Sequence, residues 1–354
     1  MEQSYRSIIS GERAGAWPAI LRALFLVVSA FYTVAVVLRN ALFDLGLKKQ
    51  HRLPVPVISV GNITTGGTGK TPTVIMIVKE LQRMGRKPAV LTRGYGAATG
   101  SKPDEVMVIE HECPGVPVVV NPDRVAGGRE AIEKHGADVL VLDDGFQHRR
   151  LARDLNIVLI DATEPMGIPG VIPRGTWREP PAALHRANMI MLTRCEQVSP
   201  ELADFASGLL TQWVNPRAIF QQRTEISGVF DSNGQPVPLV AGGGPRVLAF
   251  AGIGNPNGFL YTVRSLGMNV SAACWFADHH NYQLPGDLSR LESLTRQRHP
   301  DAWITTLKDF VKLRQAQTPI PLWHIRIEAR LRPYETELLR NRLLEVVNRG
   351  RRNC

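Results

Sequence analysis

Short hydrophobic runs alternate with segments of helical spacing along most of the chain. Pro54–Val60 (PVPVISV) is an apolar run that ends at a glycine, as buried strands often do, and Thr71–Met84 follows with helical spacing. Because strands of this kind are buried on both faces, the pattern predicts a parallel sheet covered by helices. The further predicted elements are strands at 87–92, 116–120, 137–142, 156–160 and 189–192 and a helix at about 122–135.

A second α/β pattern follows a break in composition. Residues 227–246 are rich in Gly, Pro, Asn and Asp, which predicts a linker. The chain has 354 residues, longer than one average domain. We therefore expect a domain at 51–226 and a smaller α/β domain at 247–354. The elements expected after the linker are strands at 247–251, 270–276, 302–306 and 322–327 and helices at 256–266, 285–297 and 333–348.

The N-terminal 50 residues contain an apolar segment. Ala23–Leu38 carries no charge, and Arg22 and Arg39 flank it. The run is shorter than the roughly 20 residues that span a bilayer comfortably. No signal-peptide cleavage site follows it, and the basic flanks give no clear orientation. A buried core helix is one interpretation; we favour a helix that lies in or dips into a membrane, because it is apolar on every side.

Charge and cysteine content narrow the classes of partner. The net charge of +10 favours anionic partners: nucleic acid, phospholipid headgroups or phosphorylated substrates. Only 6% of residues are aromatic, and no RNP-like, zinc-finger or basic helical motif is present, which argues against nucleic acid. The four cysteines are far apart in sequence and form no CxxC pair, so we expect no disulfide framework or zinc site.

A glycine-rich loop carries the strongest local signal. Residues 64–71 read TTGGTGKT, between an apolar strand and a helix, which is where a phosphate-binding P-loop belongs. Thr64 stands where the usual motif has its first glycine. Backbone N–H groups and the helix N-terminus would bind the phosphates, Lys70 would reach the β- and γ-phosphates, and Thr71 would ligate Mg²⁺. The candidate nucleotide-binding residues of the loop are Thr64, Thr65, Gly66, Gly67, Thr68, Gly69, Lys70 and Thr71.

Two adjacent carboxylates end a later strand. VLVLDD at 139–144 is an apolar strand followed by Asp143 and Asp144, as in a Walker B motif. Adjacent carboxylates repel each other unless a cation is near. An Asp-Asp-Gly turn would explain the residues equally well on their own. Together with the P-loop they predict a magnesium site.

The sequence resembles the tetraacyldisaccharide 4'-kinase family over most of its length. The resemblance rests on a set of motifs in a fixed order, and the fourth and sixth of them are the most specific. They are SVGNITTGGTGKTP from Ser59, TRGYG from Thr92, NPDRV from Asn121, DDGFQHRRLARD from Asp143, REP from Arg178, AFAGIGNP from Ala249, FADHH from Phe276 and TTLKDFVKL from Thr305.

The resemblance implies a specific enzymatic activity and a cellular location. It implies ATP- and Mg²⁺-dependent phosphorylation of the 4'-hydroxyl of a tetraacyldisaccharide 1-phosphate, which gives lipid IVA in lipid A biosynthesis. It also implies two α/β/α domains joined by a β-ribbon, and a peripheral or monotopic enzyme at the cytoplasmic face of the bacterial inner membrane. We expect no obligatory protein partner. The alternative from the loop alone is a P-loop ATPase or GTPase that drives a protein partner.

Individual roles are carried over from the family residue by residue. The resemblance places Lys70, Arg124 and Arg178 at the transferred phosphoryl group and His148 near the nucleotide. Thr71, Asp143, Asp144 and Glu179 are the implied magnesium ligands. We expect His279 of the second domain to approach the first domain on closure.

The base is assigned to Asp104. The family often has GDEP after the RGYG strand, and here Pro103-Asp104-Glu105-Val106 keeps only the two acidic residues. A sugar hydroxyl is a poor nucleophile, so a positioned carboxylate that accepts its proton is chemically reasonable. His279 would orient or tune this carboxylate. An exposed turn at Asp104 and a surface histidine at His279, next to His280, are the alternatives.

Overall fold

The computed structural model describes residues 2–94, 102–239, 244–282 and 286–350. The chain divides into two compact units. The first comprises residues 1–93, 115–224 and 329–354, and the second comprises residues 94–114 and 225–328. The strands β8 (Arg223–Phe230) and β12 (Leu322–Arg330) each begin in one unit and end in the other.

The first unit is built on a parallel sheet of seven strands in the order β3-β2-β4-β1-β5-β6-β7. Helix α3 packs on the central strands, and α5 packs on β2 and β3. The strands are β1 (Val57–Asn62), β2 (Pro88–Thr92), β3 (Val118–Val120), β4 (Val139–Asp143), β5 (Leu155–Asp161), β6 (Met189–Thr193) and β7 (Ile219–Gln221). The helices are α1 (Glu2–Ile9), α2 (Ala16–Asp44), α3 (Lys70–Arg83), α5 (Arg124–His135), α6 (Pro200–Leu210) and α10 (Pro333–Gly350).

Strand register brings the two phosphate-site motifs together. β1 and β4 are parallel neighbours, and Val60 pairs with Asp143. Both strands are fully buried and apolar, which is why their sequences read as continuous hydrophobic runs. The loop after β1 and the carboxylates after β4 therefore lie at the same carboxyl edge of the sheet, where open α/β sheets bind ligands.

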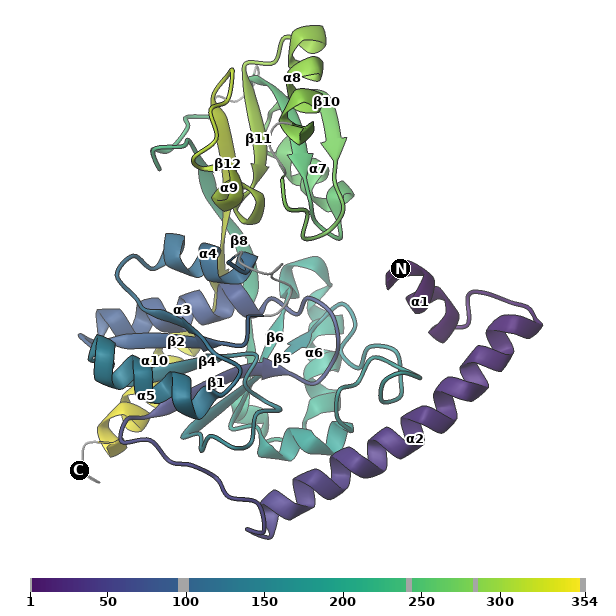
Figure 1. Ribbon diagram of the computed structural model, residues 1–354, viewed down its shortest axis with the longest axis vertical. Helices are drawn as coiled ribbons and strands as arrows, with labels where there is room; N and C mark the ends of the chain where they lie inside the picture. Colours follow the sequence, from purple (N-terminus) through teal and green to yellow (C-terminus); the bar gives the residue numbers. More distant parts are fainter. Residues whose placement is uncertain (1, 95–101, 240–243, 283–285, 351–354) are drawn as a thin grey trace. The chain divides into compact units, whose positions relative to one another are not determined.

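Helix α2 extends well beyond the apolar run that the sequence analysis singled out. It has 29 residues, and among the described residues it is the one helix long and apolar enough to cross a membrane. Figure 1 draws it in purple as one long helix. Phe31 is 75% exposed, and Leu24, Val34 and Leu38 are also exposed. Only Ser29 and Val36 are buried, so α2 is not a core helix.

The second unit contains a five-stranded sheet in the order β10-β9-β11-β12-β8. Its remaining strands are β9 (Arg246–Ala251), β10 (Asn269–Trp275) and β11 (Ala302–Thr306). Its helices are α4 (Asp104–Glu112), α7 (Pro256–Ser265), α8 (Gly286–Arg298) and α9 (Leu307–Leu313). Met107 and Val108 of α4 pack against the apolar cluster that contains Phe310 of α9.

Two segments fall outside the division expected from composition. Residues 94–114 interrupt the first unit in sequence, yet α4 packs on α9 and belongs to the second unit. The C-terminal helix α10 belongs to the first unit, where Arg340 pairs with Glu80 of α3. Local composition did not reveal either assignment, because both depend on which apolar face a helix covers.

Candidate active site

The loop after β1 has the backbone of a phosphate-binding loop. Gly66 (φ +107°) and Gly69 (φ +76°) lie in the left-handed region, where a side chain would be strained. Gly69 caps the N-terminus of α3, so the first helical N–H groups follow it directly. Thr64 has no positive φ; it is buried and pairs with Trp177 through a β-bridge. Glycine is therefore not required there, which explains the departure from the usual motif.

Lys70 and Arg178 flank a carboxylate at the end of β4. The Lys70 Nζ lies 3.7 Å from Asp144 Oδ1 and 3.3 Å from Asn62 Oδ1. Arg178 donates to both oxygens of Asp144, at 2.9 and 2.7 Å. Burial alone would raise the pKa of Asp144, but the charges of Lys70 and Arg178 outweigh burial and lower it. Asp144 is thus held ionised beside the phosphate loop.

Arg124 lies near the same carboxylates, and His148 lies near Arg124. Arg124 is buried and donates to the carbonyl of Asn121 at 2.6 Å. Burial lowers the pKa of its guanidinium, and Asp143 and Asp144 oppose that shift. Burial also lowers the pKa of His148 to about 4, with further contributions from Arg124 and Arg153. His148 is therefore neutral at pH 7 and can accept a hydrogen bond.

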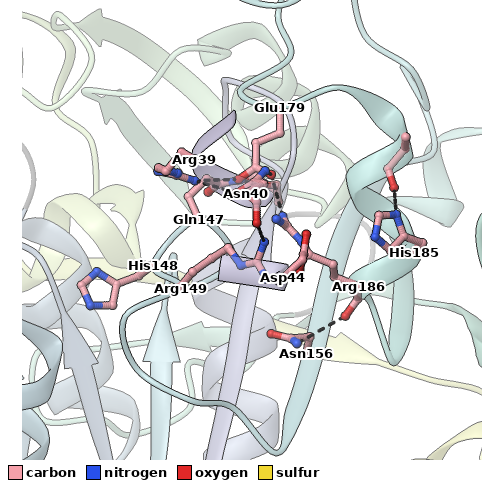
Figure 2. A network of polar contacts seen from close by, with 12 residues as sticks. Arg39, Asn40, Asp44, Gln147, His148, Arg149, Asn156, Glu179, His185 and Arg186 are labelled. Atoms are coloured by element: carbon pink, nitrogen blue, oxygen red, sulfur yellow. Dashed lines mark hydrogen bonds and ion pairs between the residues drawn. The ribbon is translucent and has the colours of Figure 1, made fainter. Parts of the chain in front are cut away.

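Glu179 lies in a different cluster from the other expected magnesium ligands. Its side chain is 1% exposed and accepts from Arg186 at 2.6 Å, Asn40 at 2.9 Å and Arg39 at 3.3 Å (Figure 2). Donors from α2 and Arg186 thus occupy both carboxylate oxygens. Its contacts connect α2 to the core, and they do not bring it to Asp144.

The remaining donors fit magnesium. Thr71 at the start of α3 and the carboxylates of Asp143 and Asp144 are hard oxygen ligands of the kind Mg²⁺ prefers. Among the described residues no group of three or more His, Cys, Asp or Glu side chains could hold a metal ion. A Mg²⁺ ion that binds with a nucleotide takes one or two protein oxygens and completes its shell with phosphates and water.

A basic cavity of about 480 Å³ lies beside the end of α2. Arg149, which is buried, donates to the carbonyl of Asn40 and pairs with Asp44 (Figure 2). Gln147 links the cavity to the phosphate loop, because its amide donates to the carbonyl of Asn62 at 2.9 Å. None of the lining residues is acidic: Arg39, Phe43, Lys48, Lys49, His51, Gln147, His148, Arg149 and Arg150.

Asp104 and His279 meet within the second unit. The His279 Nδ1 lies 3.1 Å from Asp104 Oδ2. Asp104 is the first residue of α4, and its side chain is 13% exposed. We expected His279 to reach Asp104 only when the second domain closed; instead, the packing of α4 on α9 places both residues in one unit. His280 hydrogen-bonds Asp287, so the two neighbouring histidines have different partners.

Sequence reasoning missed several charged residues of the site. Arg194 donates to the carbonyl of Gly67 in the phosphate loop and pairs with Asp161. Lys308 and Lys312 of α9 surround Asp104. The TTLKDFVKL motif contained both lysines, but their spacing alone did not indicate a partner. The TRGYG motif continues beyond Gly94, outside the described residues.

The fold and the phosphate loop define a P-loop nucleotide-binding protein. A profile of the tetraacyldisaccharide-1-P 4'-kinase family matches residues 21–348. The tetraacyldisaccharide 4'-kinase of Syntrophus aciditrophicus (strain SB) is 39% identical over 356 residues, 92% of this chain and 93% of the relative. That of Anaeromyxobacter dehalogenans (strain 2CP-C) is 38% identical over 325 residues, 86% and 85% respectively. The chain belongs to the tetraacyldisaccharide-1-P 4'-kinase family.

A solved structure agrees with this assignment over most of the chain. LpxK from Aquifex aeolicus, crystallised in complex with ATP, superimposes with a TM-score of 0.73 and 28% identity, covering 92% of this chain and 99% of that one. The protein is therefore a kinase of lipid A biosynthesis that uses ATP and Mg²⁺ and phosphorylates a 4'-hydroxyl. The alternative of a partner-driven ATPase or GTPase is not favoured.

Proposed function

We propose that this kinase transfers the γ-phosphoryl group of ATP to its lipid acceptor at the cytoplasmic face of a membrane, with the first unit binding the phosphates and the second supplying the base. The observation that carries the proposal is the contact of Lys70 with Asp144 at the carboxyl edge of the sheet. A P-loop lysine and a strand-end carboxylate are the two groups that position a nucleotide and its metal ion.

The first unit binds ATP in this proposal. The N–H groups of residues 66–71 cradle the phosphates, and Lys70 leaves Asp144 to bind the β- and γ-phosphates. Thr71, Asp143 and Asp144 would hold Mg²⁺, which would neutralise charge on the β- and γ-oxygens. Arg178 and Arg124 stabilise the charge that develops on the transferred group. Glu179 has no metal role here, because Arg39, Asn40 and Arg186 occupy its oxygens.

The second unit supplies the proton acceptor. The 4'-oxygen attacks the γ-phosphorus, the bond from that phosphorus to the β,γ-bridging oxygen breaks, and ADP leaves. Asp104 takes the hydroxyl proton, and His279 donates a hydrogen bond that orients the carboxylate. Catalysis then requires both units to bind the same pair of substrates.

The basic cavity would bind the 1-phosphate of the acceptor. Five permanent cations line it, and the carboxylates of Asp44, Glu179 and Asp123 offset only part of their charge. Lys48 and Lys49 are exposed, so a phosphate can reach them. The exposed apolar side chains of α2 would lie in the membrane and place the cavity near the headgroups.

Transfer of ³²P from γ-labelled ATP in detergent micelles tests the proposal, with tetraacyldisaccharide acceptors that carry or lack the 1-phosphate. We expect wild type to label the phosphorylated acceptor with the higher kcat/KM. Asp104→Ala should lose at least a hundredfold in kcat, whereas Glu105→Ala on the next residue should keep it. Equal kcat/KM for both acceptors would show that the cavity does not bind the 1-phosphate. Full turnover by Asp104→Ala would show that Asp104 is not the base.

A further inference from the structure

Two lysines of α9 surround the Asp104 carboxylate. The Lys312 Nζ lies 2.8 Å from Asp104 Oδ2 and donates to the carbonyl of His280 at 2.9 Å. The Lys308 Nζ lies 3.8 Å from the same Asp104 oxygen and 3.2 Å from Asp278 Oδ1. These residues all belong to the second unit. The cluster therefore exists without any contribution from the phosphate loop.

The two lysines would destabilise the second unit if the Asp104 carboxylate did not offset their charge. Lys308 and Lys312 are four residues apart on one helix, a spacing at which like charges repel. The Lys312 side chain is only 5% exposed, and a buried ammonium needs an ionic partner. Asp104 begins α4, and its carboxylate meets both ammonium groups.

Lys308 also fixes the hydrogen-bonding state of His279. The Lys308 Nζ lies 3.3 Å from His279 Nε2, while His279 Nδ1 faces Asp104. An ammonium group can only donate, so Nε2 accepts and the proton of the neutral ring is on Nδ1. His279 then donates to Asp104. Its Nε2 is occupied and cannot take up the substrate proton.

We propose that Lys308 and Lys312 are the positioning residues that make Asp104, and not His279, the proton acceptor. Lys312 anchors the carboxylate, and Lys308 keeps the imidazole in the tautomer that donates to it. This inference rests on the proposed role of Asp104 as base and adds the two groups that set its state.

Each lysine meets a different part of the cluster. Lys312 is the nearer of the two lysines to the Asp104 carboxylate, so its removal takes away the anchor of that side chain. Removal of Lys308 takes away the donor that faces His279 Nε2.

The kinetic test uses Lys312→Met and Lys312→Arg, with Lys102→Met as the control. Lys102 is an exposed lysine just before α4, the helix that carries Asp104, and it pairs with Glu110. We expect Lys312→Met to lower kcat about 10- to 100-fold with unchanged ATP affinity. Lys312→Arg keeps the positive charge and should restore much of kcat. An unchanged kcat in Lys312→Met, or no rescue by Lys312→Arg, would overturn the proposal.

A spectroscopic test does not depend on turnover. ¹⁵N-labelled imidazole signals, assigned with His279→Gln, report which ring nitrogen carries the proton and whether the other accepts a hydrogen bond. We expect a proton on Nδ1 and a hydrogen-bonded Nε2 in wild type, and a shifted Nε2 signal in Lys308→Met, which lacks the donor. The same spectrum for both would overturn the role of Lys308. Full turnover by Asp104→Asn, with the Lys308 effect on the spectrum present, would instead overturn only the proposed base.

Discussion

Each unit contains a lysine–aspartate pair, and the two pairs differ in tightness. In the first unit, Lys70 and Asp144 are 3.7 Å apart, and their side chains are 19% and 23% exposed. In the second unit, Lys312 and Asp104 are 2.8 Å apart, and their side chains are 5% and 13% exposed. The first pair is longer and partly buried beside a phosphate-binding loop, whereas the second is shorter and more buried.

We infer that Lys70 can exchange Asp144 for another partner, whereas Lys312 stays paired with Asp104. The longer pair is the weaker one, and Arg178 still pairs with Asp144 when Lys70 moves to a phosphate. A buried pair is costly to break, because each partner would be left as an uncompensated charge. Lys70 is thus suited to binding a ligand, and Lys312 to holding another side chain still.

Loss of Lys70 should have the largest effect on catalysis. We expect Lys70→Ala to lower kcat/KM at least a thousandfold, because the lysine stabilises phosphate charge in the transition state. Its melting temperature should stay near that of wild type. The control is Lys134→Ala, which removes an exposed cation of α5 that pairs with Glu130. Near-normal turnover of Lys70→Ala would show that this loop does not bind the transferred phosphate.

The first unit also contains a buried ion pair, between Glu179 and Arg186, that should be costly to break. Glu179→Gln leaves Arg186, which is buried, without its counterion, and we expect a loss of about 3 kcal/mol in unfolding free energy. Glu164→Gln removes an exposed pair with Arg6 and should cost less than about 1 kcal/mol. Chemical denaturation of both variants measures the contrast. Equal losses would mean that burial does not distinguish these pairs.

A buried histidine should make the stability of the second unit depend on pH. Burial lowers the pKa of His324 to about 4, below its unfolded value of about 6.5. The unfolded chain therefore binds more protons between these values, and stability falls as pH drops through 6.5 towards 4. The contribution between pH 7 and pH 5 is about 2 kcal/mol.

His324→Phe provides the control for this pH effect. His324 stacks on Phe310 at a centroid distance of 4.0 Å, so a phenyl ring suits the site. Burial also lowers the pKa of His148 to about 4, so the first unit retains its own pH dependence in the variant. Denaturation at pH 7 and pH 5 should give a smaller difference for the variant than for wild type. The same difference in both proteins would exclude His324 as the source.

The exposed lysines of the basic cavity should show the smallest effect. We expect Lys48→Ala together with Lys49→Ala to raise the KM for the lipid acceptor about tenfold and to leave the KM for ATP unchanged. The increase should shrink at high salt, because salt screens exposed charges. Titration of the acceptor at low and high salt measures both. A change in the KM for ATP alone would place these lysines near the nucleotide instead.

The phosphate loop and the carboxylates after β4 could be predicted from sequence because each is a local pattern. A glycine loop between a strand and a helix has one common arrangement, so Lys70 and Thr71 follow from sequence. Asp143 and Asp144 follow from a strand that ends in carboxylates. The structure adds the neighbours that come from elsewhere in the chain, among them Arg194 and Gln147.

The sequence by itself determined the alternation of strands and helices, the phosphate loop and the family of this kinase. Each of these depends on the order of neighbouring residues. Tertiary structure alone decided that α4 carries Asp104 to the second unit, that Lys308 and Lys312 surround it, and that Glu179 joins α2 to the core. Those contacts join residues about 140 to 200 positions apart, and the packing of apolar faces selects them.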